Sequence, residues 1–403
     1  MESKLVEFQR SPAYCYSQDA HPVSYLPPRN KGVGFSIYTI VKSPWSQEQG
    51  DFLLTLMEVT MKKNLWLFLM FITITVLIFS IACTSASPPP TKEPAAPPTP
   101  VPTPQEKPTQ QIKPEPEDTT NFPLTVTDDL GRKVTINKLP KRIISLAPSI
   151  TEILFALGLE DNIVGVTDYC DYPEAAKSKP RVASYTTPNA EKLVSLQPDI
   201  VLAESIHEKT VLPALEKLGF TVFVTKATSI EVVLRDITAI GQMNGRSKTA
   251  AQLVATLTSR IKAVSAKTGG LTTEKRPRVL YVVWHQPIWT MGSETFIDDL
   301  ISTAGGTNIF SKDFRESRVV SLESVVARNP QVIIITGMAT TGDLIYTSIK
   351  AEERLKSIDA MVNNRVYKAS DSNLIERPGP RIVDGLDELA KLIHPQIFGT
   401  VTR

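Results

Sequence analysis

The sequence is poor in the residues that build disulfide frameworks, metal centres and strongly charged surfaces. Its 403 residues include three cysteines and four histidines, and the net charge is +2. So few cysteines exclude a disulfide-stapled scaffold, and so few histidines argue against a site for a free metal ion. The near-neutral charge gives no field that would indicate nucleic acid. The chain also lacks a Gly-x-Ser-x-Gly elbow and a Gly-rich phosphate loop, which argues against a hydrolase or a nucleotide-dependent enzyme.

A signal for export begins at Met61. A basic segment, Met61 to Asn64, precedes an almost wholly apolar run from Leu65 to Ala82, and Cys83 follows immediately. This order is typical of a secretory signal, and a Cys at its end resembles the bacterial lipobox, in which the Cys is lipidated. The alternative is an uncleaved membrane anchor. Either interpretation places the rest of the chain outside the cytoplasm, periplasmic or on the cell surface.

The segments on either side of this signal carry no predicted function. Residues 1–60 show no clear hydrophobic periodicity and no second export signal. We therefore interpret them as an extension upstream of the true translation start at Met61. Residues 84–123 are rich in Pro, Thr, Glu and Lys. Such a composition cannot bury a core and favours extended conformers, so it predicts a semi-rigid stalk.

Two stretches about 130 residues apart follow the same pattern. In residues 190–202 and 322–334, a Glu opens a short amphipathic helix, a Pro follows seven residues later, and an apolar run comes next. The Pro is expected to end the helix, and the apolar run predicts a buried parallel strand. The repeat predicts two similar lobes with matching carboxylates, Glu191 and Glu323. The plainer alternative is that helix–Pro–strand is common in α/β proteins and that Glu favours a first helical turn.

Strands and helices alternate through the globular part, which predicts an α/β fold with mainly parallel sheets. Ser149 to Glu152 has the pattern of a capping box for a helix that ends at Gly158. From 229 to about 267 apolar residues recur at helical spacing without proline, which favours one long helix. The alternative is two helices joined by a turn at Asn244-Gly245.

These patterns divide the chain into six segments. They are the extension at 1–60, the signal at 61–83, the stalk at 84–123, a first lobe at 124–228, a linking helix at 229–268 and a second lobe at 276–403.

Several motifs together resemble one known family, the substrate-binding proteins of ABC importers for cobalamin, ferric siderophores and haem. The resemblance covers about residues 124–392. It is carried by the stretches 142–152, 164–173, 305–310 and 376–381. Tyr169 followed by Asp171-Tyr172-Pro173 is most similar to the cobalamin-binding members. The loop at 371–376 lacks the Trp that such members often carry, which leaves siderophore or haem as alternatives.

The resemblance implies roles for individual residues. It implies that Glu191 and Glu323 dock onto arginines of the transporter permease. It also implies a ligand cleft between the lobes, at the carboxyl ends of the strands. By position, the aromatic candidates for ligand contact are Tyr169, Tyr185, Trp284 and Trp289, although ordinary packing is the alternative for each. His207 or His285 is a candidate axial ligand to cobalt or iron, against the plainer interpretation of a surface or rim imidazole.

The function expected from the sequence is therefore binding rather than catalysis. We expect an extracytoplasmic, lipid-anchored monomer that captures a cobalt corrinoid and needs no cofactor or resident metal of its own. A secreted hydrolase or a structural envelope lipoprotein is the less favoured alternative. Arg181, Arg377 and Arg381 are candidates for meeting carboxylates or phosphate on a ligand, and the alternatives are that they cap helix C-termini or form surface pairs.

Overall fold

The computed structural model describes residues 120–184, 186–337 and 341–400. Cys83, the predicted signal and the predicted stalk up to residue 119 lie outside the described residues, and so does Tyr185. Within the described ranges, no helix is both long and apolar enough to cross a bilayer.

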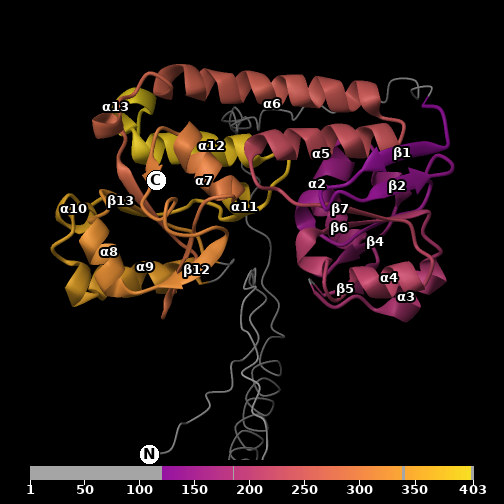
Figure 1. Ribbon diagram of the computed structural model, residues 1–403, viewed down its shortest axis with the longest axis horizontal. Helices are drawn as coiled ribbons and strands as arrows, with labels where there is room; N and C mark the ends of the chain where they lie inside the picture. Colours follow the sequence, from indigo (N-terminus) through magenta and orange to yellow (C-terminus); the bar gives the residue numbers. More distant parts are fainter. Residues whose placement is uncertain (1–119, 185, 338–340, 401–403) are drawn as a thin grey trace, which may run out of the picture. The chain divides into compact units, whose positions relative to one another are not determined.

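The first lobe is built on a parallel five-stranded sheet in the order β5-β4-β3-β6-β7 (Figure 1). Its strands are buried apolar runs, as expected for a parallel sheet covered on both faces. They are β3 (Ile143–Ser145), β4 (Ile163–Thr167), β5 (Arg181–Ala183), β6 (Ile200–Glu204) and β7 (Val222–Thr225). Its helices are α2 (Pro148–Ala156), α3 (Ala190–Leu196) and α4 (Leu212–Lys217). An antiparallel hairpin, β1 (Leu124–Thr127) with β2 (Lys133–Ile136), precedes the sheet.

The predicted capping box at the start of α2 is wrong. The N-cap is Ala147, and Pro148 occupies the first helical turn, where its missing N–H costs nothing. Ser149 therefore lies inside the helix, and its hydroxyl donates to Glu204 Oε1 at 2.5 Å. Glu152 is directed instead to arginines of the second lobe. The end of the helix was predicted correctly, since Gly158 has a φ of +68°.

The prediction of a single long linking helix is also wrong, and the alternative of two helices joined by a turn is confirmed. Helix α5 (Ile230–Met243) and helix α6 (Ser247–Thr268) are separate and pack against each other (Figure 1). The chain reverses at Gly245, whose φ of +65° suits glycine. Gly241 permits the close approach, because a Cβ there would lie 2.4 Å from the Cβ of Ala250. The connection between the lobes is therefore α6 alone, about 33 Å long at 1.5 Å per residue.

The second lobe has two sheets. One is parallel, in the order β11-β8-β13-β14, with β8 (Arg278–Val282), β11 (Thr307–Asn308), β13 (Val332–Ile335) and β14 (Val366–Lys368). The other is antiparallel, in the order β12-β10-β9, with β9 (Trp284–His285), β10 (Ile288–Met291) and β12 (Ser317–Val320). Its helices are α7 (Phe296–Thr303), α8 (Leu322–Arg328), α9 (Gly342–Ala351), α10 (Asp359–Val362), α11 (Asn373–Glu376), α12 (Ile382–Ile393) and α13 (Pro395–Phe398).

The two lobes share one hydrophobic core. A single cluster of buried side chains runs from the β1–β2 hairpin and α2, through α5 and α6, to α7, β8 and α12 of the second lobe. Two smaller clusters lie within the individual lobes, one in each. A continuous core of this kind resists wide separation of the lobes, because opening them would expose apolar surface.

Candidate functional site

A large cavity lies between the two lobes. It encloses about 1010 Å³ of empty space, part of it open to solvent. The first lobe contributes residues at the carboxyl ends of its strands, including Glu204 at the end of β6 and Thr225 at the end of β7. The second lobe contributes Met291 of β10, Ser317 of β12 and the start of α7. This position, outside the carboxyl ends of parallel strands, is where α/β folds bind ligands.

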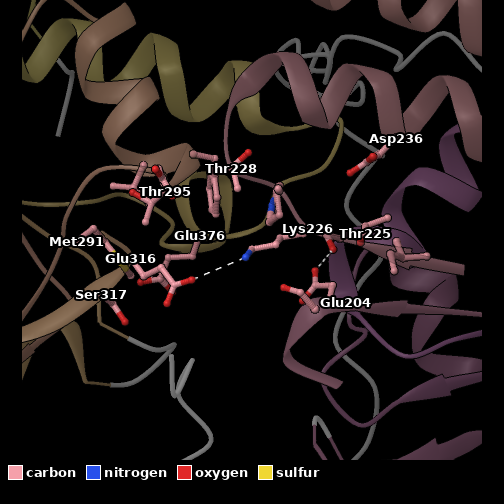
Figure 2. A pocket seen from close by; sticks show the side chains of 18 of the residues that line it. Glu204, Thr225, Lys226, Thr228, Asp236, Met291, Thr295, Glu316, Ser317 and Glu376 are labelled. Carbon is pink, nitrogen blue, oxygen red and sulfur yellow. Dashed lines mark hydrogen bonds and ion pairs between the residues drawn. The ribbon is translucent and has the colours of Figure 1, made fainter. Parts of the chain in front are cut away.

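Charged side chains from both lobes meet across this cavity. Figure 2 shows Lys226, just after β7, extending from the side of Glu204 toward Glu316 of the second lobe. The Lys226 ammonium lies 3.7 Å from Glu316 Oε1. Both side chains keep about a third of their surface exposed, so this bridge between the lobes is accessible to water.

Asp236 of α5 is a buried carboxyl in the wall of the cavity. Its pKa is raised to about 9, first by burial and then by the negative charge of Asp129, with which it shares a hydrogen bond. Arg235 opposes the shift, and Glu204 adds to it. Since that pKa lies above neutral pH, Asp236 is protonated and acts as a hydrogen-bond donor.

Glu376 of α11 is a second acid with a raised pKa. Burial of its carboxyl raises the pKa to about 7, against the opposing effects of a hydrogen bond with Thr336 and the charge of Arg377. Its carboxyl is therefore about half ionised at neutral pH. The cavity wall thus holds acids in both protonation states.

A second interlobe contact lies beside the cavity, on α2. The Glu152 carboxylate is buried and accepts two hydrogen bonds from Arg381, of 2.8 and 2.7 Å. Arg377 lies 3.3 Å from the same carboxylate and 2.5 Å from Asp171 Oδ1. The Arg381 guanidinium also covers the ring of Tyr172, 3.8 Å from its centre. These arginines therefore meet carboxylates of the protein itself.

The predicted aromatic ligand residues are not among the described residues that line the cavity. Trp289 of β10 alternates with Ile288 and Thr290, so it shares a strand face with Met291, which does line it. Trp284 pairs with Trp289 across the strands, and its Nε1 donates to the carbonyl of Gln286. Tyr169 is exposed, and its carbonyl accepts a hydrogen bond from Arg377. Their contacts with a ligand stay predictions.

The two candidate histidines, His207 and His285, differ in burial. The interpretation of His207 as a surface or rim imidazole is wrong, because its ring is buried and its Nδ1 lies 3.0 Å from the carbonyl of Glu204. His285 is partly exposed and its ring lies against Trp284. Within the described ranges, no three His, Cys, Asp or Glu side chains are grouped to hold a metal ion.

Glu191 and Glu323 occupy equivalent places in the two lobes. Each lies exposed in the first turn of a seven-residue helix, α3 or α8. Both helices end at a left-handed residue just before the proline, Gln197 in one and Asn329 in the other. Each helix therefore ends at a left-handed residue that precedes the proline, and not at the proline itself. Glu323 forms an exposed ion pair of 3.3 Å with Arg354.

Two lobes with parallel sheets, a shared connecting helix and a cavity between them define a solute-binding protein. The chain belongs to the periplasmic binding protein family, whose model matches residues 143–372. The members of this family are binding proteins.

Individual relatives agree with this assignment. The chain is 34% identical to an ABC transporter substrate-binding lipoprotein of Bacillus subtilis over 285 residues, covering 70% of this chain and 88% of the relative. It is 30% identical to the cobalamin-binding protein of Halobacterium salinarum, over 68% of this chain and 75% of that protein. The haem-binding protein RhuT of Roseiflexus superposes with a TM-score of 0.56 at 25% identity, over 63% of this chain and 98% of that one.

Proposed function

We propose that this protein binds a corrinoid between its lobes and delivers it to the permease of an ABC importer, outside the cytoplasm. The observation that supports this most directly is the interlobe cavity, in a chain 30% identical to a cobalamin-binding protein. Haem or a ferric siderophore is the alternative, because a haem-binding protein shares the fold.

The proposed ligand contacts are Tyr169, Tyr185, Trp284 and Trp289. A macrocycle offers a broad apolar face with few directional groups, and aromatic rings match such a face. Trp289→Ala should weaken cobalamin binding about thirtyfold, which corresponds to roughly 2 kcal/mol. Calorimetry on the purified chain measures this, with Leu344→Ala as a control because Leu344 is an exposed apolar residue of α9. Equal affinities for the wild type and Trp289→Ala would remove Trp289 from the site.

The proposed docking residues are Glu191 and Glu323. Complementary charges across an interface mainly set orientation and association rate. Replacing both by alanine should therefore reduce cobalamin uptake by cells and leave cobalamin affinity within about twofold. The matched control replaces the exposed Glu160 and Glu274, and uptake should be unchanged. A double variant that loses cobalamin binding would show that these glutamates support the ligand site instead.

The proposed anchor is a lipid on Cys83. The lipobox-like sequence supports it, and a relative is named a lipoprotein. Mass spectrometry of the native N-terminus should find a lipidated Cys83 with nothing before it. An unmodified Cys83 inside an intact chain would favour the uncleaved membrane anchor.

A further inference from the structure

A single lysine reaches across the cavity. Lys226 is the one basic residue among the described residues that line it, and it follows directly after β7. Its backbone N–H donates to Asp129 Oδ2 at 2.5 Å, and Asp129 also forms an ion pair with Arg235. The base of the Lys226 side chain is thus fixed, while its ammonium, at the end of a flexible aliphatic stem, can reorient.

The two exposed acids of the second lobe that line the cavity have different cationic partners. Glu294 forms an ion pair of 3.0 Å with Arg315. The Lys226 ammonium instead meets Glu316, at 3.7 Å. That distance is well beyond the roughly 2.7–2.9 Å of a charge-assisted hydrogen bond, so the contact between Lys226 and Glu316 is loose.

The backbone of Glu316 is fixed within its own lobe. Its N–H donates to the carbonyl of Ser293 at 2.9 Å, and its carbonyl accepts a hydrogen bond of 2.6 Å from the N–H of Gly292. These bonds hold Glu316 at a φ of +59°, which is uncommon for residues other than glycine. Figure 2 shows the Glu316 and Lys226 side chains extending toward each other from the two sides of the cavity. A ligand that enters between them therefore separates two charges whose backbones are held in place.

The separated charges need new partners. The Glu316 side chain is 34% exposed, so its carboxylate can turn to water. The Lys226 ammonium faces the space that the ligand occupies, and a neutral ligand surface would remove water from it without compensation. An anionic oxygen on the ligand provides that compensation, because an ammonium offers three N–H donors and binds phosphate or carboxylate as a point charge.

We infer that Lys226 binds an anionic oxygen of the metal chelate and releases Glu316 to water when it does so. In cobalamin this oxygen belongs to the phosphodiester of the nucleotide chain, and in haem it belongs to a propionate. The inference rests on the proposed function for its choice of cobalamin. It assigns to the cavity a charge contact that the aromatic candidates cannot provide.

The test compares cobalamin with cobinamide, a corrinoid that lacks the nucleotide and its phosphodiester. Calorimetry on the purified full chain measures both affinities. Lys226→Met should weaken cobalamin binding about fivefold and leave cobinamide affinity within about twofold, because only cobalamin supplies the anionic oxygen. Lys226→Arg keeps the charge and should retain the wild-type preference for cobalamin.

Two further variants sharpen the test. Glu316→Gln removes the competing carboxylate and should tighten cobalamin binding about twofold. Lys217→Met is the matched control, because Lys217 is exposed on α4 and outside the described cavity lining. Its affinities for both corrinoids should equal those of the wild type.

Three results would overturn the inference. The first is an unchanged cobalamin affinity in Lys226→Met. The second is an equal loss of affinity for cobalamin and cobinamide in that variant, which would show that Lys226 acts through the shape of the cavity and not through its charge. The third is weaker cobalamin binding by Glu316→Gln, which would show that the ligand site needs the ion pair intact.

The proposed function can fail separately. If the wild type does not bind cobalamin, haem is compared with its dimethyl ester, in which both carboxylates are masked. A loss of haem affinity of about fivefold in Lys226→Met, with unchanged affinity for the ester, supports the charge contact although the corrinoid proposal has failed. Equal effects on both, no effect on either, or no binding of either overturns the inference as well.

Discussion

Two contacts join the lobes beside the same cavity, and they are built in opposite ways. The Glu152 carboxylate has 2% of its side chain exposed and receives two hydrogen bonds from Arg381, with Arg377 beside it. The Lys226–Glu316 pair is a single contact of 3.7 Å, and its side chains are 38% and 34% exposed. Beside the cavity, the lobes are therefore joined by one fixed junction and by one contact that water can replace.

This difference suggests how the lobes respond to a ligand. A buried charge cannot lose its partners without a large penalty, so the Glu152 junction should persist in every state of the protein. An exposed pair exchanges its contact for water at little cost, so Lys226 and Glu316 can separate when a ligand enters. Together with the shared core, this predicts a small closure of the lobes on binding, not a wide hinge movement.

Breaking the fixed junction should have the largest effect. Glu152→Ala leaves Arg377 and Arg381 largely buried without their shared carboxylate. The free energy of unfolding should fall by about 3–5 kcal/mol, the usual cost of removing one partner of a buried ion pair. Urea unfolding of the purified chain measures it. Glu160→Ala, at an exposed glutamate, should change the value by less than about 0.5 kcal/mol. A loss below 1 kcal/mol in Glu152→Ala would remove the distinction between the two junctions.

Asp236 is a third carboxyl, which is buried like Glu152 but faces acids more than arginines. Around it lie Asp129, Glu204 and Arg235. Its pKa is about 9 when folded and 3.8 in the unfolded chain. The folded chain therefore holds a proton that the unfolded chain has released, and stability falls as pH rises between these two values.

Unfolding experiments between pH 6 and 8 test this carboxyl. The wild type should lose up to about 1.4 kcal/mol per pH unit through this group. Asp236→Asn keeps a donor for Asp129 but cannot ionise, so its stability should depend less on pH. Equal slopes for the two proteins would show that Asp236 is not protonated in the folded state.

The exposed pair should have the smallest effect on stability. Lys226→Met should change the free energy of unfolding by less than about 1 kcal/mol, as is usual for exposed ion pairs. A double-mutant cycle with Glu316→Gln measures the coupling directly, and we expect no more than about 0.5 kcal/mol. A coupling of several kcal/mol would mean that both contacts hold the lobes together permanently.

Much of the fold could be predicted from the sequence, because local signals and tertiary structure agree there. The apolar runs became parallel strands, and the repeat became α3–β6 and α8–β13. The predictions failed where a distant partner competes with a local one. Ser149 and Glu152 match a capping box, yet Ser149 forms its hydrogen bond with Glu204, and Glu152 accepts one from Arg381. The antiparallel sheet of β9, β10 and β12 was missed because its strands are short and the third comes 26 residues after the second.

The acidic wall of the site was also missed. Glu204, Asp236 and Glu376 come from three separate parts of the chain, and only the packing of the lobes brings them to one cavity. One signal was present, since Glu204 ends an otherwise apolar strand, and a charge in that position of an α/β fold faces the ligand crevice. The aromatic residues were easier to propose from the sequence, but the sequence pattern alone could not predict which strand faces are directed toward the cavity.

Equilibrium titration of the purified full chain with cobalamin tests whether this protein binds a corrinoid between its lobes. We predict saturable binding of one cobalamin per chain, with no comparable binding of haem or a ferric siderophore. Tight binding of haem or a ferric siderophore, with none of cobalamin, would contradict the claim.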